Sequence, residues 1–212
     1  MPAEVSSSAP PAGNLSFAQW SLTITALNRK EPGMNNLLES LPARAQDGLV
    51  NIVVDTPKGS RNKFKYDSEA KCFRLSRILP AGAIFPYDFG SIPKTLAEDG
   101  DALDVLVISD AASFTGCLLA GKLIGVISAK QTEKGEMIRN DRLLAVPVTP
   151  ANQPLYAAIG DLPESALDEL EHFFRSYNAA HGRVYNIIDR GGPVAAEQAL
   201  ARAERSWLDR EK

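Results

Sequence analysis

Three aspartates that could share a cation lie within six residues of one another, at Asp99, Asp101 and Asp104. Ionised carboxylates this close repel each other. A hard divalent cation such as Mg²⁺ relieves that repulsion, because it binds one or two carboxylates together with water and phosphate oxygens. Gly100 lets the backbone turn alternate side chains toward one centre. Because Asp-Gly-Asp is also a common solvated turn, these residues alone leave a metal site and an acidic turn equally open.

The charge distribution along the chain favours the metal site. Between Lys58 and Arg77 seven residues are basic and two are acidic, whereas between Asp88 and Asp110 six are acidic and one is basic. Phosphoryl chemistry needs cations for the charge of the substrate as well as ligands for a metal. Lys63 and Arg77 lie on opposite arms of a predicted hairpin, where their side chains can converge. An ordinary solvated hairpin face is the alternative interpretation of these two residues.

Short apolar segments separated by turn residues predict a mainly β fold with flanking helices. Gly121 and Gly125 interrupt the longest apolar segment and predict a bent barrel strand. Amphipathic spacing predicts a helix over 162–177. The expected strands are 22–25, 49–55, 63–66, 72–78, 103–108, 117–128 and 143–148, and the other expected helices are 36–41 and 194–208.

Composition and charge exclude several classes of protein. The chain has 212 residues, of which 44% are hydrophobic, which is enough for one sizeable core. A net charge of −3 argues against bulk nucleic-acid binding, which needs a basic face. No apolar run reaches the roughly 18 residues of a membrane span, and the first 13 residues lack the basic and apolar parts of a secretory signal. We therefore expect a cytoplasmic protein.

The acidic run belongs to a longer ordered set of motifs. Residues 99–105, Asp-Gly-Asp-Ala-Leu-Asp-Val, resemble the signature D-[SGDN]-D-[PE]-[LIVMF]-D-[LIVMGAC] of the family I soluble inorganic pyrophosphatases, and Ala102 is the one departure. Segments 63–67, 85–90, 143–147 and 171–177 resemble other motifs of that family in the same order. The resemblance covers about residues 48–180.

This resemblance implies a fold, a reaction and a domain division. The implied fold is a five-stranded, OB-like barrel of the α+β class. The implied reaction is hydrolysis of inorganic pyrophosphate to two phosphates by a metal-activated water, with two or more Mg²⁺ ions and a homo-oligomeric enzyme. We divide the chain into a disordered N-terminus (1–13), an N-terminal extension (14–47), a pyrophosphatase-like barrel domain (48–180) and a C-terminal helix (181–212).

The resemblance also implies roles for individual residues. Asp101 would bind metal and take a proton from the attacking water, and Asp55 would be a further acidic residue of the active site. Asp141 would be a metal ligand if the backbone shifts by one residue. The implied metal ligands are Asp99, Asp101, Asp104 and Asp141. The implied catalytic residues are Asp101, Asp55, Lys63 and Arg77. The implied substrate-binding residues are Lys63, Arg77, Tyr177 and Arg142.

Five further positions depart from the family pattern. Lys65 stands where an acidic residue is expected, Phe85 and Phe89 replace tyrosines, Asn140 replaces an aspartate, and Asn178 replaces a lysine. A charge-assisted contact is worth roughly 1.5–3 kcal/mol, so several such losses can remove turnover or change the preferred substrate.

Three alternatives therefore stay open beside a pyrophosphatase. The first is a hydrolase of another phosphoanhydride or phosphoester, and the second is a non-catalytic phosphate-binding relative. The third, ranked last, is an oligonucleotide-binding barrel in which Phe64, Tyr66 and Phe73 stack on bases. A clustered Asp loop without metal would repel the phosphates of that ligand.

Overall fold

The computed structural model describes residues 36–133, 135–151 and 154–210. From Asn36 onward the chain forms one compact unit. The expected disordered N-terminus at 1–13 and the expected strand at 22–25 lie outside the described residues. No helix in the described part of the chain is long and apolar enough to cross a membrane.

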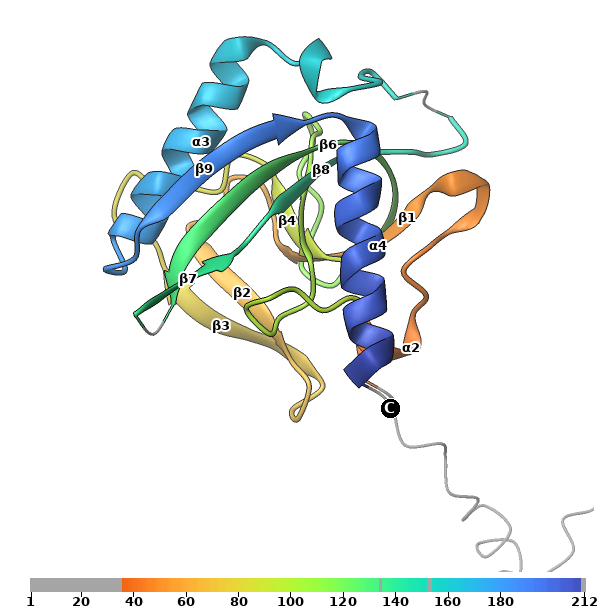
Figure 1. Cartoon of the computed structure of the whole chain (residues 1–212), viewed down its shortest axis with the longest axis horizontal. Helices are drawn as coiled ribbons and strands as arrows, with labels where there is room; N and C mark the ends of the chain where they lie inside the picture. The colour runs from red at the N-terminus through yellow and green to blue at the C-terminus, as the bar shows by residue number, and fades with distance from the viewer. Residues whose placement is uncertain (1–35, 134, 152–153, 211–212) are drawn as a thin grey trace, which may run out of the picture. The chain divides into compact units, whose positions relative to one another are not determined.

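Five strands close into a ring, which confirms the predicted five-stranded fold (Figure 1). Around the ring each strand pairs with the next, and the last strand pairs again with the first. The β5–β8 pair is parallel, and the other four pairs are antiparallel. In ring order the strands are β1 (Val50–Thr56), β4 (Asp88–Ser91), β5 (Asp104–Val107), β8 (Arg142–Pro147) and β6 (Leu118–Glu133).

The long strand β6 leaves the ring and carries two further strands, β7 (Glu136–Arg139) and β9 (Tyr185–Gly191). Its pairing with β8 shifts in register between Leu123 and Gly125. A Cβ atom at Gly125 would lie 2.6 Å from the Cβ of Ile159 and 2.7 Å from the carbonyl oxygen of Gly191. Only glycine permits this close approach. The predicted strand at 117–128 is confirmed as part of β6.

The predicted hairpin is also confirmed as a separate two-stranded sheet of β2 (Asn62–Asp67) and β3 (Cys72–Ile78). Lys63 is paired with Arg77 in its register, and the register shifts directly after this pair. Residues that face each other across an antiparallel pair project to the same side. The hairpin therefore presents the two cations together.

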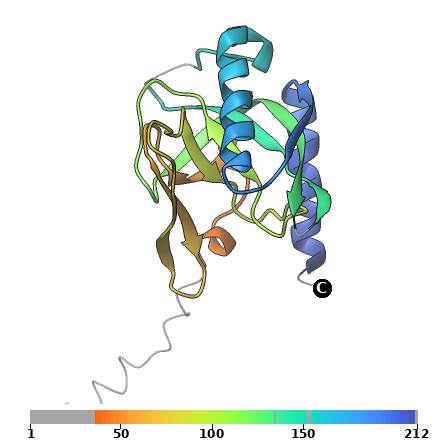
Figure 2. The ribbon, with the colours of Figure 1, turned by 90° about the vertical axis from the view of Figure 1, so that its left-hand side faces the viewer.

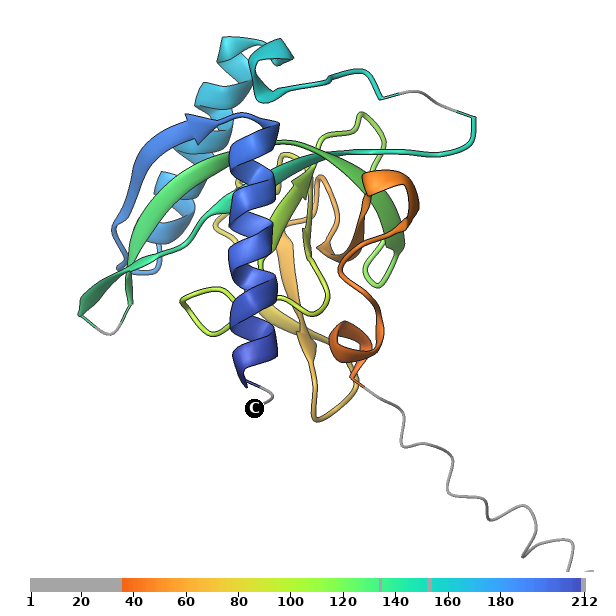
Figure 3. The ribbon, with the colours of Figure 1, turned by 45° about the vertical axis from the view of Figure 1, so that its right-hand side comes forward.

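Two long helices cover different parts of the sheet, α3 (Glu164–Ala179) and α4 (Pro193–Arg210). Figure 2 shows α3 beside the strand β9, and Figure 3 shows α4 in front of the strands. Leu170 of α3 packs in one hydrophobic cluster with Leu106 and Leu144, whereas Leu200 of α4 packs in a second cluster. Both helices were predicted. The shorter elements are α2 (Leu37–Ser40) and the 3-10 helices Gln46–Gly48 and Ile159–Asp161.

Three strands in the described part of the chain were not predicted from the sequence. The strands β4 and β7 have four residues each, too few to establish an alternating pattern. In β9 Tyr185 is buried while Ile188 is exposed, so its apolar residues do not mark one inward face. Pairing with β6 therefore places β9 in the sheet.

Candidate active site

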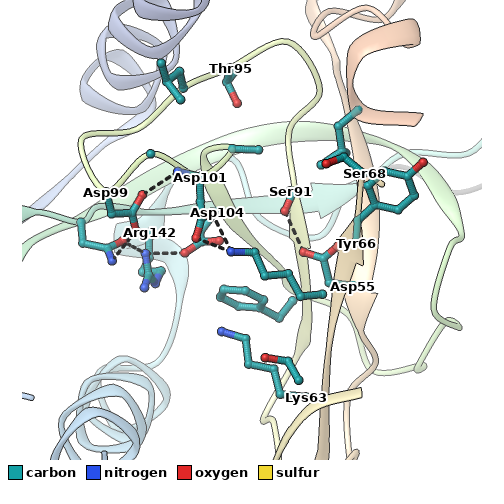
Figure 4. Close-up of a pocket in the computed structure, with 18 of the residues that line it drawn as sticks. Asp55, Lys63, Tyr66, Ser68, Ser91, Thr95, Asp99, Asp101, Asp104 and Arg142 are labelled. Carbon is teal, nitrogen blue, oxygen red and sulfur yellow. Dashed lines mark hydrogen bonds and ion pairs between the residues drawn. The ribbon is translucent and has the colours of Figure 1, made fainter. Parts of the chain in front are cut away.

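Eight of the nine predicted site residues line one pocket of about 460 Å³. Figure 4 shows three of the aspartates grouped beside Arg142, with Asp55 and Ser91 on another wall and Lys63 below them. The ends of several ring strands, the hairpin and helix α3 contribute to this pocket. The eight residues are Asp55, Lys63, Arg77, Asp99, Asp101, Asp104, Arg142 and Tyr177.

The acidic loop leads directly into β5, so Asp104 is held by the sheet while Asp99 and Asp101 lie on the turn before it. Gly100 has a φ of +86°, in the left-handed region that favours glycine. The backbone N–H of Asp101 donates to Oδ1 of Asp99 over 3.2 Å, which closes the turn. This local geometry explains why the sequence alone located the loop.

Nitrogen donors of the chain already occupy two of these carboxylates. The ammonium of Lys65 donates to both oxygens of Asp101, at 2.6 Å from Oδ1 and 2.7 Å from Oδ2. Nδ2 of Asn140 donates to Oδ2 of Asp99 over 2.9 Å. Burial raises the pKa of the Asp99 carboxyl, and the negative charge of nearby Asp104 adds to the rise. These contacts could not be read from the acidic run itself.

The third carboxylate, Asp104, is paired with a buried guanidinium. Nη1 of Arg142 lies 2.6 Å from Oδ2 of Asp104. Three aromatic rings surround the guanidinium carbon of Arg142 at 5.8 Å, 5.4 Å and 5.8 Å from the ring centroids of Phe89, Phe174 and Tyr185. Rings at this distance stabilise a cation through their quadrupoles. The arginine is therefore held firmly at the base of the acidic loop.

Asp55 is the last residue but one of β1, lines the same pocket and is only 4% exposed. The hydroxyl of Ser91 donates to its Oδ2 over 2.7 Å, while Oδ1 has no hydrogen-bond partner in the described structure. Burial raises the pKa of Asp55 to about 7; the Ser91 hydrogen bond opposes this rise, and the charge of Asp104 adds to it. A carboxyl with this pKa exchanges a proton near neutral pH.

Lys63 and Arg77 face the pocket without an acidic partner among the ion pairs of the described chain. The ammonium of Lys63 lies 5.1 Å from the ring centroid of Phe89 and 5.2 Å from that of Tyr177. Nη1 of Arg77 donates to the hydroxyl of Tyr177 over 3.4 Å. Two cations and a hydroxyl are thereby free to bind an anion.

The structure does not bring Asp141 into the pocket. Its Oδ1 accepts from the backbone N–H of Ala129 over 3.2 Å, and its Oδ2 accepts from Nε of Arg139 over 2.7 Å. Arg202 of α4 lies 3.6 Å from the same Oδ2. The side chains of a strand alternate between faces, and here Asn140 and Arg142 line the pocket while Asp141 does not.

The donor atoms suit a hard divalent cation, although the described residues hold no preformed cluster of three or more His, Cys, Asp or Glu ligands. Carboxylate oxygens are the ligands that such cations prefer. The buried Oδ1 of Asp55 lacks a partner and lies in the pocket with the acidic loop. The oxygens of Asp99, Asp101, Asp104 and Asp55 therefore suit a cation chemically, and those of Asp101 become available once Lys65 releases them.

Known proteins are similar to this chain in both sequence and fold. A family model described as inorganic pyrophosphatase matches residues 52–208. The inorganic pyrophosphatase of Synechocystis sp. is 38% identical over 151 residues, which cover 71% of this chain and 87% of that protein. The protein of the same name from Nostoc sp. is 37% identical over 154 residues, with the same coverage of 71% and 87%. Among solved structures, the inorganic pyrophosphatase of Thermus thermophilus superposes with a TM-score of 0.72 and 28% identity, covering 81% of this chain and 98% of that one.

Proposed function

The chain belongs to the inorganic pyrophosphatase family, so its activity is the metal-dependent hydrolysis of inorganic pyrophosphate, and we propose that the reaction takes place in the pocket around Asp101. The observation that carries this proposal is that unpaired cations and clustered carboxylates line the same cavity. The cations suit the negatively charged phosphates, and the carboxylates suit the metal and the attacking water.

Lys63, Arg77 and Tyr177 bind the substrate in this proposal. The ammonium and the guanidinium each donate to phosphate oxygens, and the Tyr177 hydroxyl adds a neutral donor beside Arg77. Arg142, whose Nη1 already pairs with Asp104, contributes positive charge from the base of the pocket. Positive charge on several sides of the phosphates stabilises the negative charge on the leaving phosphate.

Two carboxyl groups can handle the proton of the attacking water. Asp101, which lines the pocket, accepts it once the Lys65 ammonium has released its carboxylate oxygens. Asp55 can hold a proton at its unpartnered Oδ1, since its pKa of about 7 allows both protonation states at neutral pH. We assign Asp101 as the proton acceptor and Asp55 as the neighbouring acid–base group.

We further propose that the metal is Mg²⁺ and that two or more ions bind through Asp99, Asp101 and Asp104. Mg²⁺ takes one or two carboxylates per ion and completes its coordination with water and phosphate oxygens. When bound, it supplies charge neutralisation for the phosphates and a lower pKa for water. Asp141 is left out of this ligand set because its oxygens face Arg139 and Ala129.

We also propose a cytoplasmic homo-oligomer whose partner is pyrophosphate rather than nucleic acid. The family resemblance supports the oligomer, and the net charge of −3 supports the absence of a nucleic-acid partner. Sedimentation of the purified chain would test the first point. A sedimentation coefficient that fits a single chain at all concentrations would contradict it.

Phosphate release from pyrophosphate tests the function directly. The purified chain is assayed with and without Mg²⁺, beside an Asp101→Asn variant that keeps the shape of the side chain. We expect Mg²⁺-dependent release that the variant lacks. If the folded wild type releases no phosphate from pyrophosphate but does so from a nucleotide or a sugar phosphate, the hydrolase of another phosphorylated substrate replaces this proposal. Tight pyrophosphate binding without turnover would instead indicate a binding relative.

A further inference from the structure

The ammonium of Lys65 takes up both oxygens of Asp101. Its distances of 2.6 Å and 2.7 Å place Nζ between Oδ1 and Oδ2, where a cation would approach that carboxylate. The two side chains are 54% and 51% exposed. A cation that comes to Asp101 from solvent therefore meets a carboxylate that this chain has already neutralised.

The donors on the other two carboxylates of the loop are fixed more firmly than Lys65. Asn140 is 3% exposed and Arg142 is 5% exposed, and Nη1 of Arg142 also donates to Oδ1 of Asn140. Lys65 instead extends from the hairpin on a flexible stem, and among the described residues its ammonium hydrogen-bonds to Asp101 alone. An exposed lysine ion pair is weak and easily broken. Lys65 is thus the donor that can leave.

A second feature of the pocket indicates that a cation belongs there. Oδ1 of Asp55 is buried, has no hydrogen-bond partner in the described structure, and belongs to the pocket that contains Asp101. A buried carboxyl oxygen without a partner is costly unless a proton, a donor or a cation reaches it. The Lys65 ammonium is held at Asp101 and forms no hydrogen bond with Asp55.

We propose that Lys65 is a displaceable internal cation, which occupies Asp101 when no divalent cation is bound and must leave before one can bind there. This inference rests on the proposed role of Asp101 as a metal ligand. Lys65 then lowers the affinity of the pocket for divalent cations and sets the Mg²⁺ concentration at which phosphate release begins. It is a positioning residue, because it acts through Asp101.

Direct binding of Mg²⁺ to the full chain, measured by calorimetry without substrate, tests this idea. Lys65→Gln removes the ammonium, and we expect it to bind Mg²⁺ about two- to tenfold more tightly than the wild type. Lys65→Arg keeps the charge and should remain close to the wild type. Lys122→Gln is the matched control, because Lys122 is exposed on β6 and does not line the pocket.

The salt dependence of Mg²⁺ binding gives a second readout, which would not change if Lys65 had a purely structural role. Added salt screens an exposed ion pair. The Mg²⁺ affinity of Lys65→Gln divided by that of the wild type should therefore fall toward one as the NaCl concentration is raised. Equal or weaker Mg²⁺ binding by Lys65→Gln overturns the inference, even where the wild type shows Mg²⁺-dependent phosphate release. Absence of Mg²⁺ binding in both proteins, together with absence of phosphate release, overturns the inference and the proposed function together.

Discussion

Nη1 of Arg142 lies 2.6 Å from Oδ2 of Asp104, and the two side chains are only 6% and 18% exposed. The pair joins the first residue of β8 to the first residue of β5 across the parallel part of the ring. A buried ion pair adds little net stability, yet removal of one partner leaves an uncompensated buried charge. Arg142 and Asp104 therefore act as one unit, both in the stability of the fold and in the charge that they present to the pocket.

The Arg142→Leu variant should lose about 3–5 kcal/mol of free energy of unfolding, because it leaves Asp104 without its guanidinium. Urea unfolding followed by circular dichroism measures the loss. The double variant Arg142→Leu with Asp104→Leu should recover part of it, since no charge is then left unpaired. If the double variant loses the sum of the two single losses, the pair does not act as a unit.

Replacement of Lys63 should impair the reaction and leave stability unchanged. The ammonium is held by aromatic rings rather than by a carboxylate, so Lys63→Gln leaves no buried charge unpaired. Loss of one charge-assisted contact with phosphate should lower kcat/KM about 10- to 150-fold. Phosphate release over a range of pyrophosphate concentrations measures the change, with Lys122→Gln as the control for charge alone. A fall in unfolding midpoint that matches the fall in activity would contradict a binding role.

The stability of the metal-free protein should depend on pH through Asp55. Its pKa is raised from 3.8 to about 7 in the folded chain, so between these values the native state keeps a proton that the unfolded state has released. The free energy of unfolding must then fall as pH rises from about 4 to about 7, by at most about 4 kcal/mol, and stay level above that window.

Asp55→Asn removes this titration. The free energy of unfolding of the variant should therefore rise relative to that of the wild type as pH rises through the same window. Urea unfolding of both proteins in EDTA, at several pH values on each side of 7, gives the difference directly. Parallel stability profiles for the two proteins would show that Asp55 does not titrate in the way described.

Local sequence patterns predicted those parts of the site that are formed by one continuous segment of the chain. The Asp loop follows from a turn around Gly100, and the side-by-side placement of Lys63 and Arg77 follows from one hairpin. Which of residues 140–142 faces the pocket depends instead on the register of β8 within the closed ring. That register is long-range information, so the sequence admits Asp141 as a ligand if the backbone shifts by one residue, although its side chain bonds elsewhere.

The nitrogen donors on the acidic loop show the same limit. Lys65 comes from the hairpin and Asn140 from the approach to β8, both distant in sequence from the aspartates that they contact. The sequence marks them only as departures from a family pattern and does not say what they touch. The proposed division of the chain at residues 13, 47 and 180 likewise stays a prediction, which stability measurements on shortened chains can test.

Arg190 of β9 should matter more to stability than a surface arginine does, because it binds three carboxylates of α3 at once. Its Nε lies 2.7 Å from Oε1 of Glu171, and its Nη2 lies 2.9 Å from Oδ1 of Asp168. Its Nη1 pairs with Glu164. The side chain of Glu171 is only 9% exposed, so the loss of Arg190 weakens the compensation of a nearly buried charge. We expect Arg190→Met to lower the free energy of unfolding by about 1–3 kcal/mol.

Arg175 provides a matched control for this prediction, since it pairs with the same Glu171 over 3.2 Å but is 54% exposed and lies on the same helix. Such an i,i+4 pair contributes about 0.3–0.5 kcal/mol, so Arg175→Met should change stability little. Urea unfolding of the two variants compares a contact between β9 and α3 with one inside α3. Equal losses would mean that the ion pairs of Arg190 do not tie β9 to the helix.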